Sequence, residues 1–74
     1  MQIIPVKSSV VAKIGYDADN LFIQFVGGDW YKYSNVPETV FKRFCDADSK
    51  GQFLNREIKP KYTNYEPCIF NPVF

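Results

Sequence analysis

The chain has 74 residues, which include nine basic and eight acidic side chains, two cysteines and no histidine. A single domain of this size has only about 3–5 kcal/mol of net stability. The net charge of +1 excludes an overall electrostatic field that would attract nucleic acid or an anionic membrane. The absence of histidine removes the commonest general base and most zinc ligand sets. We therefore expect one non-enzymatic domain over residues 1–74, with no catalytic residue, no metal site and no cofactor.

The cysteines and the apolar segments predict where the protein is found. Two cysteines are too few for the disulfide framework of a small secreted domain. No stretch approaches the roughly 18 apolar residues that a membrane-spanning helix needs. The sequence thus predicts a cytoplasmic protein that does not contact a membrane.

Three strands are predicted in the first half of the chain. Residues 7–15 and 21–26 alternate between two faces, and the turn-forming residues 17–20 between them predict a hairpin. A second turn is predicted at residues 27–29, because its two glycines adopt the positive φ angles that tight hairpins need. The third strand is predicted at residues 30–34, which completes an antiparallel meander.

The third strand divides its side chains between two faces. Tyr31 and Tyr33 are two residues apart and point to one face, while Trp30, Lys32 and Ser34 point to the other. These five residues therefore cannot act as one binding patch. We expect Tyr31 and Tyr33 to pack at least in part against the helices.

Two helices are predicted after the meander. Residues 37–47 have apolar side chains on one helical face and begin with a proline, which suits a first turn. Ser49 and Gln52 match a capping box, and the helix that they begin is expected to run to about Ile58, before Pro60. Residues 63–74 are apolar without a clear period, so we expect an extended arm. The predicted fold is α+β: a three-stranded antiparallel β-meander packed against two short helices, with an extended C-terminal arm.

The second helix carries the one local excess of positive charge. Between residues 50 and 61, four basic side chains face a single acid, Glu57. With neighbouring tyrosines, such a surface binds single-stranded RNA by phosphate contacts and base stacking. The alternative is a solvated helix face beside a tyrosine-lined core.

The order of these pieces resembles the KTSC domain. The residues that carry the resemblance are Ser8, Ser9, Ile14, Gly15, Tyr16, Leu21, Phe25, Gly28, Tyr31, Lys32, Tyr33, Val36, Pro37, Ala47, Ser49, Lys50, Gly51, Phe53, Asn55, Ile58 and Tyr62. They span about residues 7–62 and leave residues 63–74 as a C-terminal extension. The family occurs at the C-terminus of some lysyl-tRNA synthetases and as free-standing small proteins of bacteria and their phages. Its function is described as unknown, and the synthetase implies RNA binding by association.

Two functions are therefore predicted. The first is binding of RNA or tRNA, through Tyr31, Lys32, Tyr33, Lys50, Asn55, Arg56, Lys59 and Lys61. The alternative is binding of a host protein, as by a phage-encoded inhibitor, or self-association through the apolar arm with Ile69, Phe70, Val73 and Phe74. A third alternative is binding of a small molecule in an aromatic pocket.

Overall fold

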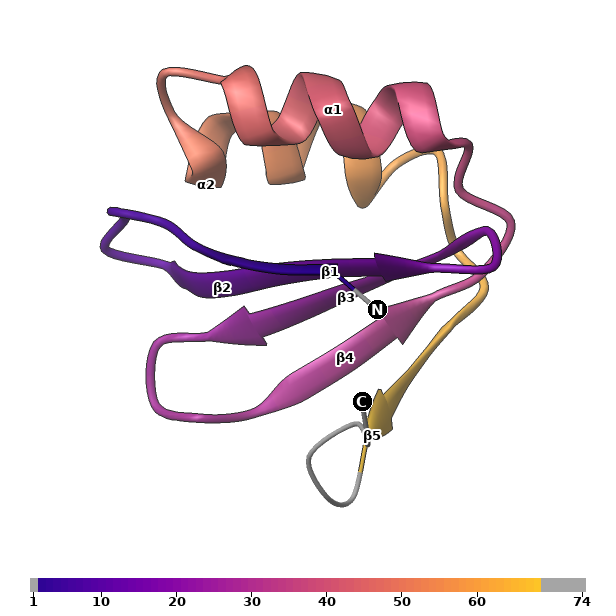
Figure 1. Cartoon of the computed structure of the whole chain (residues 1–74), viewed down its shortest axis with the longest axis horizontal. Helices are drawn as coiled ribbons and strands as arrows, with labels where there is room; N and C mark the ends of the chain where they lie inside the picture. The colour runs from indigo at the N-terminus through magenta and orange to yellow at the C-terminus, as the bar shows by residue number, and fades with distance from the viewer. Residues whose placement is uncertain (1, 69–74) are drawn as a thin grey trace.

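The computed structural model describes residues 2–68 of the chain. One antiparallel sheet has its strands side by side in chain order, and two helical segments lie together on one face of it (Figure 1). The elements are β1 (Gln2–Pro5), β2 (Val11–Asp17), β3 (Asn20–Phe25), β4 (Trp30–Tyr33), α1 (Glu38–Asp46), α2 (Lys50–Phe53), the π-helical turn η1 (Leu54–Ile58) and β5 (Tyr65–Cys68).

The α+β class is confirmed, but the predicted three-stranded sheet is wrong, because the sheet has five strands. The two strands that were missed, β1 and β5, are its edges and have four residues each. Neither segment alternates clearly between apolar and polar residues, and each contains a proline, which is tolerated at a sheet edge. Part of the predicted arm is thus β5, and residues 69–74 lie outside the described residues.

The strand predicted at residues 7–15 begins later, at Val11. The side chain of Ser8 accepts hydrogen bonds from the backbone N–H groups of Val10 and Val11, at 3.1 and 3.2 Å, which holds the chain in a bend there. A β-bulge at Ala12 then shifts the register between β2 and β3. As a result Val11 and Ile14, three residues apart, both point into the core, which simple alternation does not predict.

Both predicted hairpin turns are present. Ala18 and Asp19 have φ angles of 51° and 65°, which is the backbone of a two-residue hairpin turn. Gly27 and Gly28 have φ angles of 113° and 105° and connect β3 to β4. The first hairpin is fastened to the start of α1, because the hydroxyl of Tyr16 donates a hydrogen bond of 2.6 Å to the carbonyl of Val36.

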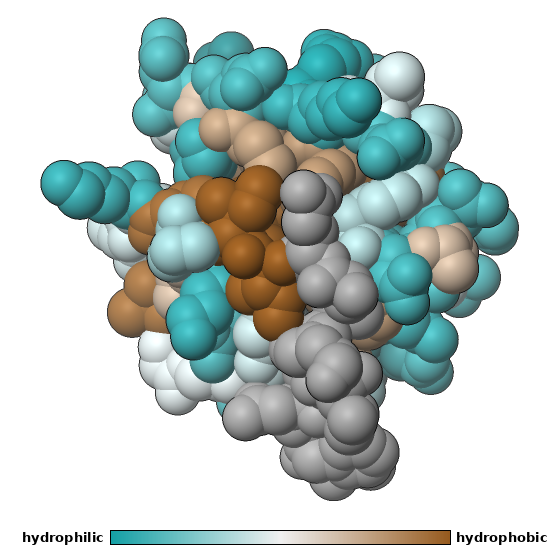
Figure 2. Space-filling view, viewed as in Figure 1, coloured by the Kyte–Doolittle hydropathy of each residue, from teal (hydrophilic) through white to brown (hydrophobic). Residues whose placement is uncertain are grey.

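The helices close the core from one side. Phe41 and Phe44 of α1 are buried, and Ser49 caps α2 by accepting a 3.2 Å hydrogen bond from the backbone N–H of Gln52. Leu54 and Ile58 of η1 are also buried. Hydrophilic side chains cover the outside of this helical layer, at the top of Figure 2. Among the described residues, no helix is long and apolar enough to cross a membrane.

Candidate functional site

The register of β4 decides which of the predicted site residues can act together. Tyr33 lies opposite Leu21 and Tyr31 lies opposite Ile23, so both tyrosines share the face that the helices cover. Lys32 lies between them and points to the other face. The predicted division of the strand is confirmed. Tyr33 belongs to the buried core that includes Phe41 and Phe44 of α1, and Tyr31 is partly buried against that core.

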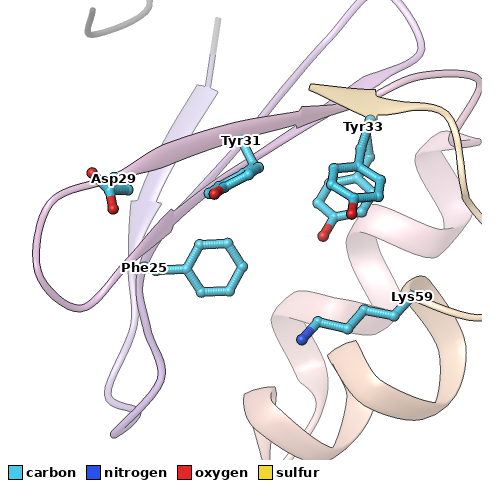
Figure 3. A pocket seen from close by; sticks show the side chains of 6 residues that line it. Phe25, Asp29, Tyr31, Tyr33 and Lys59 are labelled. Carbon is cyan, nitrogen blue, oxygen red and sulfur yellow. The ribbon is translucent and has the colours of Figure 1, made fainter. Parts of the chain in front are cut away.

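A surface pocket of about 500 Å³ is lined by side chains of β3, β4 and β5, of the turn before β4 and of the residue that follows η1. We call it the tyrosine pocket, and its lining residues are Phe25, Asp29, Tyr31, Tyr33, Lys59 and Tyr65 (Figure 3). The rings of Tyr33 and Tyr65 stack with their centroids 5.2 Å apart. Phe25 meets Tyr31 edge to face at 5.5 Å. Four aromatic rings from β3, β4 and β5 therefore form one continuous wall.

Tyr33 contributes a hydroxyl group to this wall. Only 3% of the residue is exposed, yet its hydroxyl has no hydrogen-bond partner among residues 2–68 and is not sealed in the core. In Figure 3, Tyr33 lies on the same side of the pocket as Lys59. A nearly buried phenol of this kind presents a hydrogen-bonding group to whatever enters the pocket.

Two charged side chains approach the pocket from opposite ends (Figure 3). Lys59 follows η1, where its backbone N–H donates to the carbonyl of Leu54 at 2.9 Å and closes the π-helical turn. Asp29 lies in the turn before β4, where its carbonyl accepts a 2.8 Å hydrogen bond from the N–H of Phe25. Within the described part of the chain, neither the Lys59 ammonium nor the Asp29 carboxylate has an ion-pair partner. The pocket thus offers one positively charged hydrogen-bond donor, the Lys59 ammonium, and one negatively charged acceptor, the Asp29 carboxylate.

The other predicted cations lie elsewhere or are already engaged. Lys32 is on the outer face of the sheet, 3.1 Å from the carboxylate of Glu66. The ammonium of Lys50 donates to the carbonyl of Ala47 at 2.5 Å. Asn55 is exposed and does not line the tyrosine pocket.

Glu57 neutralises part of the predicted basic surface. Its carboxylate is 3.2 Å from Lys61 and 3.3 Å from Arg43. The hydrogen bond from Lys61 and the charges of both cations lower the pKa of Glu57 below its ordinary value. Arg56 lines a second groove, of about 340 Å³, together with Arg43 and Phe53. Of the predicted cations, Lys59 alone lines the tyrosine pocket.

Three pocket residues were not predicted as site residues: Phe25, Asp29 and Tyr65. Phe25 was placed on the same face as Ile23 by alternation, and the pairing of β3 with β4 could have brought it next to Tyr31. Asp29 was interpreted only as a turn residue. Tyr65 had no usable signal, because β5 was not predicted and its position opposite Tyr33 depends on that strand.

The raised pKa of Tyr33 predicts how the stability of the protein depends on pH. Burial raises the pKa of Tyr33 above its ordinary value of 10.0, and the nearby phenols of Tyr65 and Tyr31 raise this pKa further. The unfolded chain therefore loses the Tyr33 proton at lower pH than the folded chain does. The contribution of this group to the free energy of unfolding is complete below pH 10 and is lost as the pH rises above it. We expect the urea midpoint of the parent chain to fall more steeply than that of Tyr33→Phe as the pH rises above about 10.

The remaining decline in Tyr33→Phe should come from Tyr16, whose pKa is raised mainly by burial and also by Asp19, and from Cys45 and Cys68, whose thiol pKa values are raised mainly by burial. Because the Tyr33 hydroxyl has no hydrogen-bond partner within residues 2–68, the Phe variant should be about as stable as the parent chain at pH 7. Parallel pH curves for the two proteins would contradict the assignment.

Comparisons with known proteins agree on the region that contains most of this site. The family model of the KTSC domain matches residues 7–62. A protein of Tsukamurella paurometabola is 40% identical over 60 residues, which are 78% of this chain and 90% of that protein. A lysine–tRNA ligase of Nostoc punctiforme is 36% identical over 58 residues, which are 76% of this chain and 10% of the ligase. The crystal structure of a KTSC domain protein from Yersinia pestis is 41% identical, with a TM-score of 0.81, and the match covers 90% of this chain and 96% of that one.

Proposed function

We propose that the chain, which belongs to the KTSC domain family, binds single-stranded RNA and that the tyrosine pocket receives a base. A region of a lysine–tRNA ligase is similar to this chain. The observation that carries this proposal is the combination of four aromatic rings with the unpaired Lys59 in one pocket of the described structure. The ligase supports it only by association, since the shared region is a small part of that enzyme.

The chemistry of the pocket favours an unpaired nucleotide over other ligands of similar size. Aromatic side chains stack on any base, and each such stack contributes about 1–3 kcal/mol to binding. An ammonium at the edge of the stacking surface can contact the phosphate that follows the base. A base within a duplex is already stacked on its neighbours, so the proposed ligand is a single strand or a loop.

The cations outside the pocket have unequal roles in this proposal. Arg56 and Asn55 are exposed on η1, the turn that precedes Lys59, and would extend the contact to neighbouring nucleotides. Lys61 would contribute less, because Glu57 already shares its charge. Lys32 lies on the opposite face of β4 from Tyr31 and cannot contact the same nucleotide.

Lys59→Gln tests the proposal. We expect the parent chain to bind a dye-labelled single-stranded RNA of about 12 nucleotides at 50 mM salt, with affinity that falls as salt rises. Removing one phosphate contact should weaken binding about 5- to 10-fold at this salt and reduce the slope of log K against log salt by about 0.7. Fluorescence anisotropy at four or five salt concentrations measures both quantities.

Lys42→Gln is the matched control, since Lys42 is an exposed lysine of α1 that does not line the tyrosine pocket. It removes the same charge and should change the affinity less than about twofold, because an exposed lysine away from the ligand acts only through a screened field. Undetectable binding of the parent chain at 50 mM salt, or equal losses in the two variants, would refute the proposed site.

The second candidate function is binding of a protein partner, for example a host protein inhibited by a phage-encoded member of the family. One observation favours it: β5 is an edge strand without a further strand partner within residues 2–68, and such edges accept an added strand. Its predicted contact residues, Ile69, Phe70, Val73 and Phe74, lie outside the described residues. Capture of a bacterial partner that survives nuclease treatment would favour this candidate over RNA.

A further inference from the structure

The tyrosine pocket contains groups that can distinguish one base from another. Stacking of a base on an accessible aromatic ring is independent of sequence. Contacts with the charged groups at the two ends of the pocket depend on the base, since a carboxylate only accepts hydrogen bonds and an ammonium only donates them. Asp29 and Lys59 therefore impose a polarity on any base that lies between them (Figure 3).

We propose that the tyrosine pocket selects guanine, with Asp29 accepting hydrogen bonds from N1–H and the N2 amino group. Lys59 has three N–H donors, so it can donate one to O6 or N7 while another contacts the phosphate that follows the base. This inference rests on the proposed RNA binding and adds base specificity to it. Guanine has two adjacent donors on its Watson–Crick edge, which match the two oxygens of one carboxylate. Its O6 and N7 are the acceptors that lysine and arginine contact most often in nucleic-acid recognition.

The other three bases match this arrangement less well. Adenine and cytosine each place an amino donor beside a ring nitrogen that is an acceptor, and this acceptor would face the Asp29 carboxylate. Uracil has a single N–H between two carbonyl oxygens. In each case a carboxylate oxygen is left against an acceptor, which costs binding free energy because the repulsion is not offset by a hydrogen bond.

The structure gives Asp29 the freedom and position for this role. Its backbone is fixed by the hydrogen bond to Phe25, while its carboxylate has no hydrogen bond or ion pair among residues 2–68. Tyr33 adds a hydroxyl that is nearly buried, has no partner among the same residues and faces the pocket, so it can donate to O6 or accept from the base. No contact within the described fold needs either group, which leaves both available to the base.

A set of heptamers tests the inference. Dye-labelled UUUNUUU single strands, with guanine, adenine, cytosine, uracil or hypoxanthine at the central position, would be measured by fluorescence anisotropy at 50 mM salt. We expect guanine to bind about 10-fold more tightly than adenine, cytosine or uracil, as good base contacts give. Hypoxanthine keeps N1–H and O6 but lacks the N2 amino group, so its affinity should lie several-fold below that of guanine.

Asp29→Asn should reduce the preference for guanine to within about twofold, since its amide offers one acceptor where the carboxylate offers two. Asp17→Asn is the matched control, because Asp17 is also an exposed turn-side carboxylate but does not line the pocket. It should keep the full preference. Thermal unfolding of both variants would verify that each is folded.

The outcomes separate the two proposals. Equal binding of all five heptamers, a preference for another base, or an Asp29→Asn variant that still prefers guanine would each overturn guanine selection while leaving RNA binding in place. No detectable binding of any heptamer at 50 mM salt, while the strand of about 12 nucleotides binds, would also overturn guanine selection alone. No detectable binding of either kind of strand would overturn the proposed function, and guanine selection with it.

Discussion

Tyr31→Ala is expected to weaken binding of single-stranded RNA by about 5- to 150-fold, the range that corresponds to the loss of one base stack worth about 1–3 kcal/mol. Tyr31 lies between two other pocket rings, because it contacts Phe25 and Tyr65 at centroid distances of 5.5 and 6.2 Å. It is half-buried, so part of its ring is accessible to a ligand. Fluorescence anisotropy with the same labelled RNA measures the loss.

Tyr31→Phe separates stacking from the hydroxyl and from the fold. The phenylalanine keeps the ring and its contacts with Phe25, so we expect RNA affinity within about threefold of the parent chain. Equal binding by the Ala variant and the parent chain would show that Tyr31 does not stack on a base. Equal losses in both variants would assign the effect to the hydroxyl instead.

The helix-facing half of the fold was predictable because its signals are local. The alternation in residues 21–26 and the apolar stripe of residues 37–47 each lie within one element, and β3 and α1 formed close to the predicted positions. The edge strands were not predictable for the same reason. What makes Tyr65–Cys68 a strand is its pairing with β4, more than 30 positions earlier, and nothing in a four-residue stretch with a proline records that pairing.

In the candidate site too, local features were predictable and tertiary contacts were not. Tyr31, Tyr33 and Lys59 were predicted and lie in one pocket, because alternation and charge could be found in single segments. The pairing of Glu57 with Lys61 follows from i, i+4 spacing, whereas its pairing with Arg43 requires α1 and η1 to be neighbours. Whether a lysine is available for a ligand therefore depended on tertiary contacts that the sequence did not contain.

The π-helical turn explains why Lys59 differs from the other cations of its segment. Leu54 and Ile58 are both buried. The backbone N–H of Lys59 donates a hydrogen bond to the carbonyl of Leu54, five residues earlier. Such turns add one residue to a helical repeat and rotate the residues that follow. A regular α-helix to Ile58, as the capping box predicted, would have given Lys59 a different direction. The position of this lysine in the pocket thus follows from the turn.

Phe44→Ala is expected to unfold the protein at room temperature. Phe44 is fully buried, and its ring stacks on Phe53 with centroids 5.2 Å apart. Replacing a buried phenylalanine by alanine costs about 3–5 kcal/mol, because apolar contacts are lost and a cavity remains. This cost equals the whole net stability of about 3–5 kcal/mol expected for a domain of this length. Circular dichroism and urea denaturation at 25 °C would measure it.

Val26→Ala is the control for this loss, since Val26 is 58% exposed in the turn after β3. Its truncation should change the free energy of unfolding by no more than about 0.5 kcal/mol. A Phe44→Ala variant that unfolds at the same urea concentration as Val26→Ala would contradict the core assignment. If Phe44→Ala is unfolded as expected, it should also lose RNA binding entirely, because the tyrosine pocket exists only where β4, β5 and η1 are packed together. An unfolded chain with a net charge of +1 has no other means of holding an RNA strand at moderate salt.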